Sequence, residues 1–115
     1  LLLDADDTVS FANARAGIWL PQAAGRRLTE ALQDADFALV TETGQPVAGG
    51  NPVVERCLAA GENIDGVWLK RGSGPGEVWL SLRARPFGDA DGAVLGATIT
   101  LADRSEEHER LMESA

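Results

Sequence analysis

Cysteine, histidine and tyrosine are almost absent from this sequence of 115 residues, which has only Cys57, His108 and no tyrosine. A single cysteine can form neither an internal disulfide nor, by itself, a thiolate zinc site, and it fits a reducing compartment. No apolar run approaches the ~18 residues of a membrane helix. The run at residues 1–3 is too short for a signal-peptide core, and no basic residue precedes it. We therefore expect a cytoplasmic location and no membrane insertion by this segment.

Basic residues are also few, with 10 Lys and Arg against 18 Asp and Glu. They are scattered, whereas the neutralisation of phosphates needs clustered Lys and Arg. This argues against binding to nucleic acid and to an anionic membrane surface. The length and the 44% of hydrophobic residues are typical of one globular domain. There is no initiating Met, so we expect both ends to be boundaries inside a longer protein.

The first quarter of the sequence predicts two short strands and a helix. The apolar run 1–3 and the alternating segment 9–12 read as strands, and the acidic stretch 4–7 between them reads as a solvated turn. Asn13 is suited to cap a helix over 14–20, because its side chain can accept a hydrogen bond from a free backbone N–H.

Further helices are expected before the middle of the chain. Helical spacing of apolar residues predicts one or two turns between 25 and 37, and 43–46 reads as a turn. Gly49-Gly50 is a break, and Asn51-Pro52 then opens the best-marked helix, with Asn as its cap and Pro in its first turn. The apolar stripe of this helix is Val54, Cys57 and Leu58, and Gly61 supplies its stop.

The second half predicts three antiparallel strands over 67–71, 78–85 and 94–102. Pairing Leu69 with Val78 joins two apolar faces. The same register sets Trp68 opposite Trp79 and Lys70 opposite Glu77, and both pairs are favourable across strands. On the third strand the core face is predicted to consist of Leu95, Ala97, Ile99 and Leu101.

The last segment, 105–115, is polar and helical, with acidic residues in its first turn, where the helix dipole favours them. Asp103 or Ser105 can cap it, and Asp103 with Glu106 makes a variant of the capping box. His108 is expected to be solvated. Leu111 and Met112 form only a thin apolar stripe, so we expect a linker or coiled coil that continues outward.

The order of these elements, together with several short motifs, resembles the PAS sensor domains, specifically the PAS/PAC domains of bacterial signalling proteins. In the first half, the resemblance rests on the opening strands 3–13, which end at Asn13, and on 43–46 and 51–62 around the long helix. In the second half, it rests on the strand 78–87 with its proline, the turn 89–92 and the last strand at 95–97. Asp103-Arg104-Ser105 is similar to the Asp-Ile-Thr exit motif of that family. Arg104 departs from the apolar residue that is usual in the exit motif.

The resemblance implies an α+β fold, namely a PAS-like five-stranded antiparallel sheet with short helices on one face and a C-terminal exit helix. It implies a sensor domain over 1–104 and the start of a linker or signalling helix over 105–115. Such a domain is not an enzyme. It binds a small ligand or forms a homodimer, and it relays a signal to a covalently linked output domain. Diguanylate cyclases and histidine kinases of two-component systems are the expected parent proteins.

The resemblance also indicates which residues would carry these roles. Asp103 and Ser105 would relay the signal into the exit helix. Trp68 and Trp79 lie on the outer sheet face, where either a partner subunit, a flanking helix or the stems of Lys70 and Arg83 could cover them. The residues expected to line a ligand pocket, or to fill it as core, are Phe11, Trp19, Val54, Cys57, Leu58, Leu80, Leu82 and Ile99.

The identity of a cofactor stays open. Haem is argued against, because haem-binding PAS domains present a histidine from the long helix and the histidine here is His108. Cysteinyl-flavin chemistry is argued against, because the residues around Cys57 do not match the flavin motif. No metal site is expected, since Val9 and Arg15 occupy the positions at which a calcium loop beginning at Asp4 needs Gly and Glu.

Two other functions remain as alternatives. A structural dimerisation module with a filled core and no ligand would use the face that carries Trp68 and Trp79. A small enzyme would need a buried titratable residue, and the sequence indicates none. A Ser-His-Asp set would have to recruit His108 from the exit segment.

Overall fold

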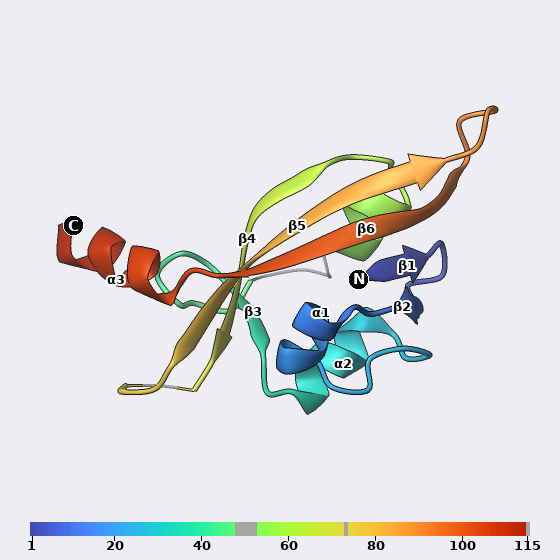
Figure 1. The fold of residues 1–115 in the computed structure, drawn as a ribbon. Coiled ribbons are helices and arrows are strands. Elements are labelled where there is room, and N and C mark those ends of the chain that lie inside the picture. The colour runs from blue at the N-terminus through green and yellow to red at the C-terminus, as the bar shows by residue number, and fades with distance from the viewer. Residues whose placement is uncertain (48–52, 73, 115) are drawn as a thin grey trace.

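Six antiparallel strands form one open sheet in the computed structural model, which describes residues 1–47, 53–72 and 74–114 without the side chains of Val54, Met112 and Ser114. The strands are β1 (Leu2–Asp4), β2 (Val9–Phe11), β3 (Ala38–Val40), β4 (Ile64–Arg71), β5 (Val78–Gly88) and β6 (Val94–Asp103). Their spatial order is β2-β1-β6-β5-β4-β3 (Figure 1). The predicted α+β fold is thus confirmed, with six strands instead of the expected five.

The additional strand is β3, which pairs with β4 from Ala38 opposite Lys70 to Val40 opposite Trp68. Three residues are too few to show a period of two, and their partner strand lies far along the chain. Only the folded structure therefore reveals this strand.

The helices are α1 (Ala14–Trp19), α2 (Leu28–Asp34), the wide π-helix η1 (Val53–Leu58) and α3 (Ser105–Ser114). Asn13 caps α1 as predicted, because its Oδ1 accepts the Ala16 N–H at 2.9 Å. Loss of such a cap typically costs about 1 kcal/mol.

Helix η1 is wider than the α-helix that the sequence predicted. Its buried residues Val53, Cys57 and Leu58 are spaced i, i+4 and i+5, which suits a helix with i→i+5 bonds. Gly61 ends it as predicted, with φ +69° and its N–H donated to the Cys57 carbonyl at 3.0 Å. The predicted break at Gly49-Gly50, the predicted start at Asn51-Pro52 and the side chain of Val54 lie outside the described residues.

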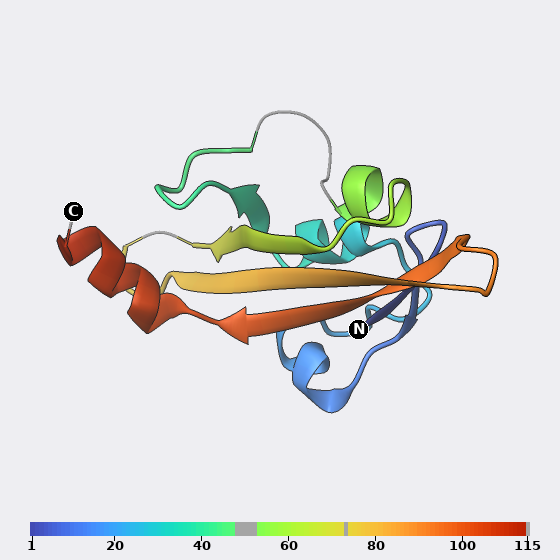
Figure 2. The same cartoon turned by 90° about the horizontal axis from the view of Figure 1, so that it is seen from above.

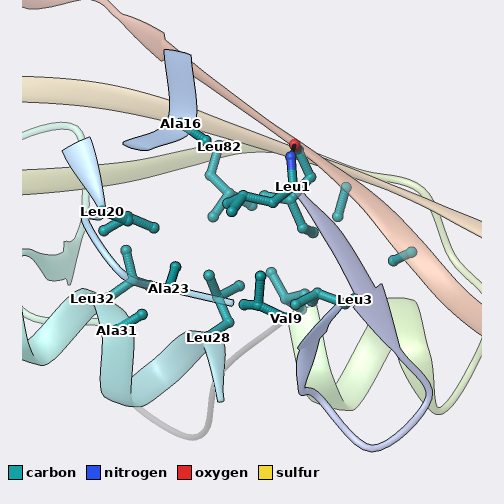
Figure 3. Close-up of a cluster of buried hydrophobic side chains, with 14 of the residues drawn as sticks. Leu1, Leu3, Val9, Ala16, Leu20, Ala23, Leu28, Ala31, Leu32 and Leu82 are labelled. Atoms are coloured by element: carbon teal, nitrogen blue, oxygen red, sulfur yellow. Dashed lines mark hydrogen bonds between the residues drawn. The ribbon is translucent and has the colours of Figure 1, made fainter. Parts of the chain in front are cut away.

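One apolar core lies between the sheet and the helices. Side chains from β1, β2, α1, α2 and β5 meet there, among them Leu3, Val9, Leu28 and Leu82 (Figure 3). Burial of each such side chain stabilises the fold by about 2 kcal/mol. Beyond this core, α3 projects past the end of β6 (Figures 1 and 2).

The register of β4 and β5 differs by two residues from the predicted one. Leu69 lies opposite Leu80, and Trp68 lies opposite Ser81. A shift of two keeps every side chain on its predicted face, so the apolar pattern fits both registers equally. In the structure the last pair of β4 and β5 is Arg71 with Val78, whereas the predicted register pairs Leu69 with Val78.

Part of the predicted core face of β6 is also corrected. Ala97 and Ile99 are buried, but Leu95 is 52% exposed. A bulge lies here, because Phe87 pairs with Gly96 and Gly88 with Val94. Leu95 is the extra residue and leaves the alternating pattern.

Candidate functional site

The first turn of α3 is tied to the backbone of β5 at Trp79. The Trp79 carbonyl accepts the Arg104 N–H at 2.8 Å, and the Trp79 N–H is donated to Ser105 Oγ at 3.1 Å. These bonds follow directly on the last strand pair, Leu80 with Asp103. Both backbone groups of Trp79 are therefore bonded to residues at the start of α3.

The start of α3 is further ordered by its own side chains. Asp103 Oδ1 accepts the Ser105 N–H at 3.0 Å, and Arg104 Nη1 pairs with Glu107 Oε1 at 3.0 Å. Glu106 and Glu107 also lie in the first turn, where negative charge stabilises a helix. Asp103 therefore lies where the sequence placed it, between the last strand and the exit helix.

Contacts between aromatic side chains also attach the first turn of α3 to the sheet. The His108 ring stacks on Trp79, with centroids 3.4 Å apart and planes 14° apart. Trp68 meets both rings edge-on, at 6.0 Å from Trp79 and 5.4 Å from His108. His108 Nε2 lies 2.6 Å from the Glu42 carbonyl oxygen, so the loop after β3 also touches α3.

The prediction that His108 is solvated was wrong, because its side chain is only 5% exposed. The helical spacing of His108 with Leu111 did not signal this burial, because Leu111 is 42% exposed. Ser105 Oγ and the Glu42 carbonyl were missed as contacts, since they meet partners that are distant in the sequence.

Charged groups surround the Trp79 ring. The Trp79 indole N–H is donated to Glu77 Oε1 at 3.0 Å, and Lys70 Nζ lies 3.6 Å from Glu77 Oε2 and 5.3 Å from the ring centroid. The hydrogen bond from Trp79, assisted by the charge of Lys70, holds the pKa of Glu77 below its ordinary value. The carboxylate thus fixes the orientation of the indole that carries His108.

A hollow of about 600 Å³ opens beside this contact, between the loop 74–77 and α3. Glu77, Glu109 and Glu113 line it together with Trp79 and His108. Within the described part of the chain, no three His, Cys, Asp or Glu side chains are grouped so that they could hold a metal ion.

Comparison with protein families agrees with this geometry: a family model described as PAS fold matches residues 1–109. The chain belongs to the PAS family. PAS domains are in general sensory or regulatory modules without catalytic activity, so membership indicates such a role for this domain. Comparison with curated proteins and with solved structures gives no match. No described helix of the domain is long and apolar enough to cross a membrane.

The residues predicted to line a pocket or fill the core lie mostly in the core of this PAS domain. Cys57, Leu58, Leu80, Leu82 and Ile99 are buried in one cluster, and a half-buried Trp19 packs against it. The hollow beside Trp79 is not lined by Cys57, Leu58, Leu80 or Leu82. Burial raises the pKa of the Cys57 thiol, which suits a packed side chain and not a reactive thiolate.

Phe11 does not belong to this set, because it is 56% exposed. It pairs with Leu2, which is also exposed, on the β2–β1 edge of the sheet. In the short strand β2 only Val9 points inward. The prediction that Phe11 lies in the core was wrong because three residues left the inward and outward positions of β2 undecided.

The outer face with Trp68 and Trp79 is covered by the chain itself. Trp79 is only 4% exposed, because α3 covers it through His108. The sequence left open whether a partner subunit, a flanking helix or side-chain stems cover this face. In the structure the flanking helix α3 covers Trp79, and Lys70 lies beside its ring. Trp79 therefore does not offer an open surface to a partner while α3 is docked.

A second unusual group, Asp7, lies in the turn between β1 and β2, and the prediction that 4–7 is a solvated turn fails at this residue. Asp7 is 7% exposed, and its Oδ1 has no hydrogen-bond partner among the described residues. Its carbonyl accepts the Leu28 N–H at 3.1 Å, so it fastens the start of α2. Burial raises the pKa of Asp7 from 3.8 to about 6, although the charge of Arg27 opposes the shift.

We expect Asp7→Asn to raise the free energy of unfolding by about 1 kcal/mol near neutral pH and by less near pH 4. The pKa of Asp7 is raised in the folded state, so the stability that its protonated form confers is complete below about 3.8 and is lost as the pH rises through about 6. Asn keeps the shape without the charge and tolerates the positive φ of 70°. Urea unfolding at both pH values measures the difference, with Asp6→Asn as the exposed control. An equal gain at both pH values would contradict the assignment.

Proposed function

We propose that this PAS domain is a relay module that passes a change in its sheet to an output domain through α3. The observation that supports the proposal is the triple attachment of Trp79, whose carbonyl, N–H and ring all bind the first turn of α3. A displacement at this end of β5 would therefore change the position or the order of α3.

The remainder of the proposal follows from the family. The output domain would be a diguanylate cyclase or a histidine kinase, the working form a homodimer, and the location cytoplasmic. The one cysteine, Cys57, is free and buried, which is compatible with a reducing compartment. A small-molecule ligand would supply the input.

The test compares two aspartates whose carboxylates each accept a hydrogen bond from a backbone N–H two residues further along the chain. Asp103→Ala removes the acceptor for the Ser105 N–H at the start of α3. Asp89→Ala removes an acceptor for Asp91 and Ala93 in the β5–β6 hairpin, far from α3. Each change should lower the free energy of unfolding by only about 1 kcal/mol, so both variants remain folded.

We expect Asp103→Ala to change the activity of the output domain in the full-length protein at least several-fold, and Asp89→Ala to leave it unchanged. Hydrogen exchange should show faster exchange in 105–114 for Asp103→Ala only. If the two variants have the same output activity, the relay role of Asp103 is wrong.

A ligand-free dimerisation module is the second candidate. It is favoured by the packing of the predicted pocket residues, since Cys57, Leu80 and Leu82 have no exposed surface. Native mass measured against denatured mass separates the two functions. Retained extra mass in each subunit would contradict the ligand-free function, and a monomer in sedimentation would contradict dimerisation in either function.

A further inference from the structure

A groove runs between α1 and the second half of β6. It consists of two adjoining hollows of about 520 Å³ and 250 Å³, which share Arg15, Thr100 and Leu101 in their linings. Figure 2 shows α1 beside β6. The larger hollow alone is within the usual range for small-molecule sites.

Apolar side chains form part of the walls of the groove. Ile18 is 70% exposed, the highest exposure among the large exposed apolar side chains of the described residues. Trp19 and Leu101 are half-buried and line the same hollow. A hydrocarbon group lying here would cover Ile18 and remove apolar surface of both molecules from water.

The charge in the groove comes mainly from arginine. The Arg15 guanidinium makes no hydrogen bond or ion pair with any described residue, although acidic residues outnumber basic ones by 18 to 10. Arg104, at the far end, is paired with Glu107. Asp103 also lines this end, with its Oδ1 engaged by the Ser105 N–H. Arg15 is thus the cation left for a ligand, and its planar fork matches a carboxylate.

We propose that this groove binds an amphipathic carboxylate, with the carboxylate on Arg15 and the apolar part along Ile18, Trp19 and Leu101. The proposal names a ligand class for the sensor and rests on the proposed function in that respect. The groove ends at Asp103 and Arg104, so a bound ligand would lie next to the first turn of α3. A ligand in the groove would therefore contact Asp103 and Arg104, which belong to the attachment of α3 to β5.

The probe is sodium decanoate, titrated below its micelle concentration into the ¹⁵N-labelled chain. The three tryptophans separate the sites, because Trp19 lines the groove whereas Trp68 and Trp79 lie in the α3 contact. We expect the indole N–H resonance of Trp19 to shift more than the other two. Shifts centred on Trp68 or Trp79 would overturn the location.

Arg15→Gln is expected to weaken decanoate binding about tenfold, because a charge-assisted hydrogen bond is lost. Arg56→Gln is the matched control, since Arg56 is also exposed and pairs only with Glu62. Equal weakening by both substitutions, or none by Arg15→Gln, would contradict the role of Arg15.

Two further probes test the ligand class. Decyltrimethylammonium has the same tail and the opposite charge, and acetate has the carboxylate without the tail. We expect neither to shift Trp19 at concentrations at which decanoate does. Equal binding of the ammonium probe, or no binding of decanoate, would overturn the proposal. Because binding is measured directly, this result is independent of the Asp103→Ala test of the relay.

Discussion

Replacing Trp79 with alanine is expected to lower the free energy of unfolding by about 3 kcal/mol and to release α3 from the sheet. The side chain is 4% exposed, stacks on His108 and donates its indole N–H to Glu77. Removal of the ring leaves the backbone bonds to Arg104 and Ser105 without the aromatic contact above them. Urea unfolding measures the stability, and hydrogen exchange in 105–114 measures the release.

Two control variants identify the cause of this effect. Trp79→Phe keeps a ring for His108 but removes the bond to Glu77, so it should retain most of the protection of α3. A double-mutant cycle with His108→Ala should give a coupling of about 1 kcal/mol, which is typical of aromatic pairs. Additive effects of the two substitutions would mean that the stack does not hold the helix.

The second large effect is expected for Gly96→Ala, with a loss of about 3 kcal/mol. A Cβ at Gly96 would overlap the Leu3 carbonyl oxygen and would lie 2.7 Å from the Phe87 ring. Gly96 pairs with Asp4 of β1 and with Phe87 of β5, so the backbones cannot separate without breaking the sheet. The close approach of β1 to β6 therefore requires glycine at this position.

Gly17→Ala is the matched control for this prediction. Gly17 lies inside α1, and nothing is within 4 Å of a Cβ placed there. Alanine favours the helix, so this variant should gain up to about 1 kcal/mol. Thermal unfolding of the two variants measures whether Gly96→Ala lowers the stability and Gly17→Ala raises it. Tolerance of Gly96→Ala would show that β1 does not approach β6 so closely.

Short-range chemistry could be predicted from the sequence because the signal and its effect lie a few residues apart. Asn13 caps α1 with a side chain three residues from its donor. Gly61 stops η1 because it adopts a positive φ without a Cβ clash. The alternation of Leu80, Leu82 and Ala84 placed these side chains on the core face, and all three are buried.

Long-range choices were decided by tertiary structure, because each depends on contacts that local pattern does not specify. The register of β4 and β5 was such a choice, since a shift of two residues satisfies the same alternation. His108 was another, because its partners Glu42 and Trp79 come from other elements. Asp7 was a third, since burial of its carboxyl depends on α2 packing over the turn.

The sequence by itself thus determined the family, the order of the helices and the main strands, and the core face of β5, because these rest on local capping, stop signals and period-two alternation. The tertiary structure alone decided how α3 is held. A polar helix has little apolar surface of its own to bury, so its position follows from the surface it meets. Here that surface is the ring and both backbone groups of Trp79.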